Sequence, residues 1–304
     1  MNAIDLYIKT FQTLYSPNRR ADKLLSQLRY LVRHIANKHL STLLDKPPAD
    51  TRCATRDPRV VVSLTSFPAR IDSVWQVVEN MKRQTVQPGK IILWLSEEQF
   101  PHADSVPRSL RDRTDDMFEL RIVPGDLRSH KKYCYAFREF PDHNIILVDD
   151  DIYYPTTTVE QLLAAHARHP EAVICRYGCV PRYGADGSLL PYTEWPFCRG
   201  PHTAGNIFFG SGGGTLIVPR TMHPDVTDSR LFMRLAPTAD DIWLNAMARL
   251  ARTPIVKLPS GIIMEIENRR RVSLHQVNVL QHKNDEQIAN VVRHYAQRGL
   301  TLRM

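Results

Sequence analysis

The stretch NIILVDDDIYYP (residues 144–155) runs four apolar residues directly into Asp149, Asp150 and Asp151. A short apolar run of this kind is typical of a buried strand, and open α/β sheets bind their ligands beyond the carboxyl ends of the strands. Because adjacent carboxylates repel one another, they need a cation nearby. Carboxylate oxygens suit Mg²⁺ or Mn²⁺, and these ions commonly bridge to phosphates. The stretch therefore predicts a divalent cation site at a strand end, with a helix cap or turn cap as the structural alternative.

Predicted strands and helices alternate on both sides of this stretch, from residue 59 to residue 176. Such alternation predicts an α/β fold with a mostly parallel central sheet and helices on both faces. Beyond residue 176 the sequence is rich in glycine, proline and aromatic residues, and a last helix and strand follow. The predicted strands are 59–66, 90–96, 118–124, 144–150, 171–177 and 254–259, and the predicted helices are 71–84, 129–140, 156–169 and 239–252.

The first fifty residues are predicted to form a helical extension, followed by a linker at 45–58. Leu24, Leu28, Leu31 and Ile35 are among the apolar residues that share one helical face there, and basic residues fall among the remaining positions. A basic amphipathic helix can lie in a membrane interface or pack on its own domain. We therefore divide the chain into the extension with its linker, residues 1–57, and a main domain with a basic C-terminal tail, residues 58–304.

The net charge of +8 is carried by the two ends of the chain. Residues 1–50 contribute +4 and residues 268–304 contribute +5, which leaves the middle near −1. This distribution suits a protein that rests on an anionic membrane surface or grips a phosphate-bearing substrate. A nucleic-acid groove is not expected, because aromatic residues are not interleaved with the basic ones.

The sequence has neither the ~20 uninterrupted apolar residues of a membrane-spanning helix nor an apolar secretory signal. Its five cysteines are odd in number and scattered, which favours a reducing compartment. We therefore expect a cytoplasmic protein, with peripheral contact to the inner face of the cytoplasmic membrane as a further expectation. A homodimer is the other partner arrangement that the sequence leaves open.

A second acid pair, Asp240 and Asp241, stands in PTADDIWL (residues 237–244), at the predicted start of a helix. Acidic residues at a helix N-terminus also compensate the helix dipole, so the pair has a purely structural interpretation as well. Together with the acid triplet, the pair would divide the chemistry. A metal ion on the triplet would neutralise a diphosphate leaving group, and a separate carboxylate would take a proton from an attacking hydroxyl.

Five segments, taken in order, resemble bacterial glycosyltransferases of the GT-A fold, which are inverting and related to family 2. The closest likeness is to the enzymes of capsule and lipopolysaccharide assembly, and it covers residues 59–290. The resemblance implies metal-dependent transfer of a sugar from a nucleotide-diphosphate donor, UDP by default, to a hydroxyl of a glycan or lipid-linked glycan. The segments are VVVSLTSFPARI, QTVQPGKIILWLSEEQFP, SHKKYCYAF, IILVDDDIYYP and PTADDIWL.

The resemblance also implies roles for individual residues. Asp149 and Asp151 match the Asp-x-Asp motif that holds Mn²⁺ or Mg²⁺ against the donor, and Asp241 matches the catalytic base, with Asp240 second. Alternation along a strand would send Asp149 and Asp151 to one side and Asp150 to the other. His282 is a further metal-ligand candidate, with a surface histidine as the alternative. The remaining donor-binding positions implied by the resemblance are Thr65, Ser66, Arg70, Lys131, Lys132, Asp150 and Gly213.

Three other functions stay open at this point. Two are enzymatic, a retaining transferase of the same fold and a sugar nucleotidyltransferase, and the third is a non-enzymatic basic binding or scaffold protein. A structural zinc site is a separate question, because Cys175, Cys179, Cys198 and His202 have the spacing C-x3-C-x18-C-x3-H.

Overall fold

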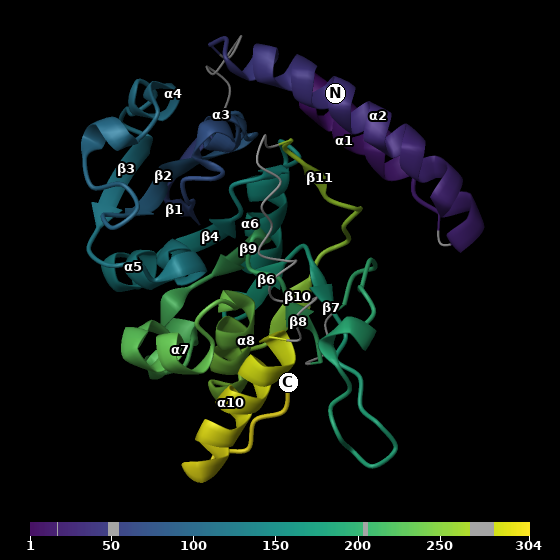
Figure 1. Cartoon of the computed structure of the whole chain (residues 1–304), viewed down its shortest axis with the longest axis vertical. Helices are drawn as coiled ribbons and strands as arrows, with labels where there is room; N and C mark the ends of the chain where they lie inside the picture. Colours follow the sequence, from purple (N-terminus) through teal and green to yellow (C-terminus); the bar gives the residue numbers. More distant parts are fainter. Residues whose placement is uncertain (17, 48–54, 203–205, 268–282) are drawn as a thin grey trace.

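A seven-stranded sheet forms the centre of the molecule (Figure 1). The structure is a computed structural model, which describes residues 1–16, 18–47, 55–202, 206–267 and 283–304. In the order β10-β6-β9-β4-β1-β2-β3, β9 runs antiparallel to both of its neighbours, and the other pairs are parallel. The strands are β1 (Thr55–Thr65), β2 (Val86–Ser96), β3 (Phe118–Val123), β4 (Asn144–Val148), β6 (Val173–Cys175), β9 (Gly213–Ile217) and β10 (Ile255–Lys257).

Two short antiparallel pairs lie outside this sheet. In one, β5 (Ile152–Tyr153) pairs with β11 (Met264–Glu265), and in the other β7 (Gly178–Cys179) pairs with β8 (Phe208–Phe209). The α-helices of the described residues are α1 (Ala3–Thr13), α2 (Arg19–Leu44), α3 (Val74–Lys82), α4 (Arg108–Arg111), α5 (Lys131–Glu139), α6 (Thr158–Arg168), α7 (Ser229–Leu235), α8 (Asp240–Leu250) and α10 (Lys283–Gln297).

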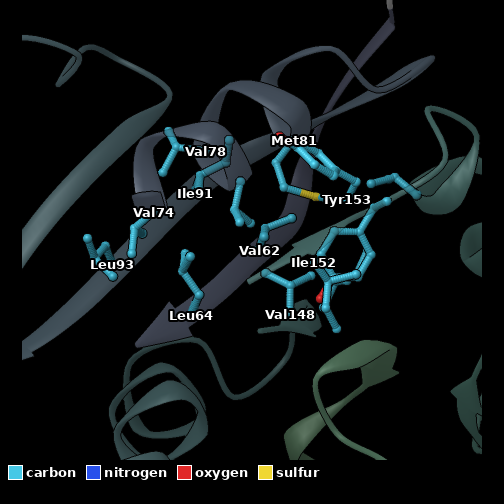
Figure 2. Packing of buried hydrophobic residues seen from close by; sticks show 14 of the residues in the cluster. Val62, Leu64, Val74, Val78, Met81, Ile91, Leu93, Val148, Ile152 and Tyr153 are labelled. Carbon is cyan, nitrogen blue, oxygen red and sulfur yellow. The ribbon is translucent and has the colours of Figure 1, made fainter. Parts of the chain in front are cut away.

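Each face of the sheet has its own apolar core, because successive side chains of a strand point to opposite faces. On one face, Val62 and Leu64 of β1 pack with Val74 and Val78 of α3, as Figure 2 shows. On the other face, Val61 of the same strand belongs to a core built with α5, α7, α8 and α10. The α/β class, the mostly parallel sheet and the helices on both faces are thus confirmed.

The two N-terminal helices lie side by side at one end of the molecule (Figure 1). Ile4 and Ile8 of α1 and Ala36 and Leu40 of α2 are buried in the same core as strand β1. The predicted extension is therefore helical, and it packs directly on the main domain. No helix in the described parts of the chain is both long and apolar enough to cross a bilayer.

Several predicted boundaries are wrong, and two of them change the description of the chain. Strand β1 begins at Thr55, inside the predicted linker, because residues 55–57 pair with residues 86–88 of β2. Strand β4 ends at Val148, earlier than predicted, so the three aspartates lie in the turn between β4 and β5. Strand alternation therefore does not govern the directions of their side chains.

Candidate active site

The two acid clusters meet at the carboxyl end of β4, and Lys132 joins them. Its Nζ atom lies 2.9 Å from Asp149 Oδ1 and 2.9 Å from Asp240 Oδ2. Lys132 is buried in the first turn of α5. Burial opposes its charge, but Asp149, Asp240 and Asp241 outweigh burial and raise its pKa. This lysine is therefore a permanent cation between two groups of carboxylates.

The SHKKY segment is held in place by His130, just before helix α5. Its buried ring stacks on Phe232, with ring centroids 4.2 Å apart. Burial lowers the pKa of His130 to about 4, so the ring is neutral at physiological pH. A carbonyl can only accept, so Nε2–H donates to Ala236 O at 2.8 Å and Nδ1 accepts from the Tyr133 hydroxyl at 2.8 Å. These bonds fix the start of α5 against the loop that leads into Asp240.

The glycine-rich loop before β9, around residues 210–212, lies between the two acid clusters and bonds to both. Ser211 Oγ donates to Asp240 Oδ2 at 2.7 Å, and Ser211 N–H donates to Asp241 Oδ1 at 2.7 Å. One residue later, Gly212 O accepts from Asp149 N–H at 3.0 Å. A Cβ atom at Gly212 would collide with the Asp149 carboxylate. Glycine is therefore required at this position because the backbone passes directly beneath a carboxylate.

The two acids of the 240–241 pair differ in charge state although they are neighbours. Burial opposes ionisation of Asp240, but Lys132 outweighs burial and lowers the pKa of Asp240 to about 2. Burial raises the pKa of Asp241, and the charge of Asp240 raises it further, to about 6. Asp240 is buried and ion-paired, whereas Asp241 is partly exposed. Asp241 is therefore the member of the pair that can exchange a proton near neutral pH.

The acid triplet is held from its other side by Arg70. The Nη1 atom of Arg70 lies 2.9 Å from Asp150 Oδ1 and 2.7 Å from Asp151 Oδ2. Ser66 Oγ donates to Asp150 Oδ2 at 2.5 Å. Asp150 and Asp151 thus share a cation instead of pointing to opposite sides of a strand. The expected separation of Asp150 from Asp151 is wrong, because the residues form a turn.

The triplet remains short of positive charge. Asp149 to Asp151, Asp240 and Asp241 gather at this end of the sheet, and the basic side chains that pair with them in the described structure are Lys132 and Arg70. Burial and the charge of Asp150 raise the pKa of Asp151 to about 7. The oxygen chemistry of Asp149 and Asp151 and this excess of negative charge fit a divalent cation. Within the described ranges, no three acidic, histidine or cysteine side chains gather to hold a metal by themselves.

Three other predicted donor-binding residues have other partners. Thr65 Oγ1 donates to Trp94 O at 2.8 Å, at the carboxyl end of β1. Lys131 is buried and ion-paired with Asp126, away from the acid clusters. Gly213 lies beneath the ring of Tyr177, which a Cβ atom at that position would strike. His282 lies outside the described residues.

The four residues with zinc-like spacing do not form a metal site. Cys175 is buried in β6, and Cys179 Sγ approaches Phe208 O. Cys198 Sγ approaches Gly200 O, and His202 Nε2 lies 2.9 Å from Asn206 Oδ1. Each of the last three side chains therefore has a partner of its own.

Sequence reasoning did not single out three residues that complete the site, Tyr154, Ser211 and Tyr177. Tyr154 accepts a hydrogen bond from Asp149 N–H at 2.8 Å and donates to Gly212 O, and Ser211 bonds to both acids of the second pair. A Cβ atom at Gly210 would lie 3.9 Å from Asp241 Oδ2 and 4.0 Å from Tyr177 Cβ, so Tyr177 lies near the proton-exchanging acid. Tyr154 lies in DDDIYYP (residues 149–155) and Ser211 in the glycine-rich segment GSGGG (residues 210–214), and the signal was their position within those segments.

The opposite end of the sheet has an open hollow of about 420 Å³. Its lining includes Arg59, which precedes the apolar part of β1, and Asn144, the first residue of β4. The acids follow the carboxyl end of β4, so this hollow is separate from the candidate active site.

Comparison with known proteins yields structural similarity but no sequence match. No family model and no curated protein sequence matches the chain. Among solved structures, the chain is similar to the mannosyltransferase PcManGT from Pyrobaculum calidifontis, in complex with GDP-Man and Mn²⁺. The TM-score is 0.49 and the sequence identity is 13%, over 95% of this chain and 76% of that chain. The similarity concerns the course of the backbone, and inferences about function rest on the acid clusters.

Proposed function

We propose that this chain is a metal-dependent, inverting glycosyltransferase of the GT-A type, which transfers a sugar from a nucleotide-diphosphate donor to a hydroxyl. The observation that carries the proposal is that Lys132 is ion-paired with both acid clusters, through Asp149 and Asp240. This buried lysine brings a negatively charged triplet, suited to a metal and diphosphate, next to an acid pair in which Asp241 has a pKa of about 6. A cation site and a proton acceptor are the two parts that such a transfer needs.

Asp241 is the proposed general base. A carboxylate with a pKa of about 6 is ionised at neutral pH and is more basic than an ordinary aspartate. The acceptor oxygen forms a bond to the anomeric carbon of the sugar while its proton passes to Asp241. The bond from that carbon to the diphosphate oxygen breaks, and the diphosphate leaves with the electron pair. Attack from the face opposite the diphosphate inverts the anomeric configuration.

Asp149 and Asp151 are the proposed ligands of Mn²⁺ or Mg²⁺. When bound, the ion would neutralise charge on the leaving diphosphate, whose oxygens complete the coordination of such ions. Lys132 and Arg70 hold the three carboxylates of the triplet in place through the ion pairs described above. Arg70 and Ser66 both bond to Asp150, and the resemblance implies that these two residues contact the donor.

The proposed donor is a UDP-sugar, and the proposed acceptor is a glycan or lipid-linked glycan of a cell-surface polysaccharide, capsule or lipopolysaccharide. Both assignments rest on the sequence resemblance of residues 59–290. The glycine-rich loop and Tyr177 lie beside Asp241 and would form the acceptor side of the site.

Thermal unfolding in the presence of nucleotide-sugars, with Mn²⁺ or with a chelator, tests the donor and the metal together. We expect one nucleotide class to raise the melting temperature only when Mn²⁺ is present. Incubation of that donor with simple glycan acceptors, followed by NMR of the product, then reads the anomeric configuration. Retention would point to a retaining transferase, and release of pyrophosphate to a nucleotidyltransferase. A chain that binds no nucleotide-sugar and hydrolyses none would contradict the proposal.

A further inference from the structure

The outward side of helix α2 carries a row of large apolar side chains, Leu24, Leu28, Leu31 and Ile35, which we call the outer stripe. These side chains are 77%, 50%, 52% and 48% exposed. Their spacing of four, three and four residues puts them on one face of the helix. Single exposed leucines are ordinary on a protein surface, but an aligned row of four marks an interaction site.

The rest of the helix is fixed, so the outer stripe cannot turn inward. Ala36, Leu40 and Leu44 are buried in the core of the main domain. Asn37 Nδ2 donates to Glu265 O at 3.1 Å, and Arg33 Nη1 lies 3.1 Å from Glu265 Oε2. The apolar face of α2 is therefore wider than the part of the main domain that packs against it, and the outer stripe stays exposed.

The charges around the outer stripe are cationic. The nearby acids have partners, since Asp22 is ion-paired with Arg29 at 2.6 Å and Asp45 with Arg113 at 2.5 Å. Arg20, Lys23 and Lys38 are exposed, and no carboxylate in the described ranges lies within ion-pair distance of them. Arg20 is one helical turn before the outer stripe and Lys38 is one turn after it.

These cations distinguish between two possible partners for the outer stripe, a second copy of the chain and a lipid surface. In a symmetric dimer, each subunit would present the same patch to the other, and uncompensated cations would face cations. An anionic lipid surface instead neutralises lysines and arginines, while its acyl chains accept leucine side chains. We infer that the outer stripe of α2 docks on an anionic lipid bilayer, with the helix lying in the interface plane and Arg20, Lys23 and Lys38 at the level of the lipid phosphates.

Docking through α2 would also orient the candidate active site. The middle of α2 is bonded to β11, and β11 pairs with β5, which directly follows the acid triplet. Ile266 N–H donates to Asp151 O at 2.7 Å. The site is thus held at a fixed orientation to the bilayer, as an enzyme with a membrane-borne acceptor requires. The docking surface itself does not depend on the chemistry proposed for the acids.

Sedimentation with vesicles tests this surface. The full chain should sediment with vesicles of phosphatidylcholine mixed with an equal amount of phosphatidylglycerol, and much less with phosphatidylcholine alone. High salt should weaken the binding. The variant Leu24→Gln/Leu28→Gln/Leu31→Gln/Ile35→Gln should bind at least about tenfold more weakly. Its melting temperature should stay near that of the unmodified chain, because all four side chains are exposed. A full chain that ignores phosphatidylglycerol, or a variant that binds as well as the full chain, would overturn the inference.

Two matched controls isolate the apolar and the charged contributions. The variant Ile122→Gln/Leu300→Gln replaces apolar residues of 38% and 39% exposure outside α2 and should bind vesicles normally. The variant Lys23→Gln/Lys38→Gln should lose affinity about fivefold per lysine. Arg230→Gln/Lys283→Gln makes the same change of charge elsewhere and should not.

Light scattering separates lipid binding from self-association. We expect the mass of one chain for both the unmodified protein and the outer-stripe variant. A dimer that dissociates only in the outer-stripe variant would assign the stripe to a second copy and overturn the lipid inference.

Discussion

The acid triplet at residues 149–151 and the acid pair at residues 240–241 are built from the same residue type and share one lysine, yet they differ in what they can do. The triplet is crowded, with Arg70 shared between Asp150 and Asp151. In the pair, Lys132 forms an ion pair with Asp240 and not with Asp241, and Asp241 has a raised pKa. A triplet short of cations suits the proposed metal site, whereas a pair in which only Asp240 is ion-paired suits the proposed base. Environment thus assigns roles that residue type alone does not.

Removing the proposed base should have the largest effect. Asp241→Asn should slow sugar transfer by roughly 10²–10⁴-fold, the range that general base catalysis contributes. Donor binding should be nearly unchanged, because the metal site and Lys132 are untouched. Transfer assays and donor titrations measure the two quantities. Asp186→Asn, at an exposed loop aspartate, is the control and should leave both unaltered. Full activity of Asp241→Asn would refute its role as the base.

Removing the shared lysine should damage both clusters at once. Lys132→Met leaves the carboxylates of Asp149 and Asp240 without their cation, and loss of one partner of a buried ion pair costs about 3–5 kcal/mol. Donor binding and transfer should both be lost. Lys131→Met is the matched control, because Lys131 is also buried and ion-paired, but with Asp126. It should cost stability and spare most of the transfer activity. Denaturant titration and activity assays measure the difference, and equal loss of activity in both variants would contradict the special position of Lys132.

Changing the triplet should affect the proposed metal site. Asp151→Asn should weaken Mn²⁺-dependent donor binding at least about tenfold, because a neutral amide is a poorer ligand than a carboxylate. Asp150→Asn should mainly lower stability, since Asp150 is buried between Arg70 and Ser66. Calorimetric titration of the donor with and without Mn²⁺ compares the two variants. Equal Mn²⁺ dependence in Asp151→Asn and the unmodified chain would exclude Asp151 as a ligand.

The raised pKa of Asp241 predicts two smaller effects. Transfer should fall about tenfold per pH unit below pH 6, as the base becomes protonated. The folded-state pKa lies above the ordinary value of 3.8, so ionisation of Asp241 opposes folding. This opposition is absent below pH 3.8, grows as the pH rises to 6 and is constant above that. Asp241→Asn should therefore be more stable than the unmodified chain by about 3 kcal/mol at pH 8, and the gain should vanish near pH 4. Thermal melts across this range measure the difference, and a constant gain would contradict the assignment.

The sequence predicted the sheet and both acid clusters because strong patterns encode them. The apolar run before Asp149 and the helical period after Asp241 are local signals. The roles of Lys132 and Arg70 were harder to assign, because they depend on which of several cations meets which acid after folding. Lys131 and Lys132 are adjacent and chemically identical, and only the rotation of α5 sends one to Asp126 and the other to the acid clusters. The sequence also could not predict that half of the apolar face of α2 stays exposed, because hydrophobic periodicity identifies an apolar face but not what packs against it.

The bridge at Lys132 has a consequence for how the protein folds. Its partners lie far apart along the chain, on the turn after β4 and at the start of α8. Contacts of such long sequence separation form only when loop-closure entropy has been overcome, so they come late in folding. We therefore expect the site to form late in folding, and recovery of binding of the proposed donor during refolding would test this order.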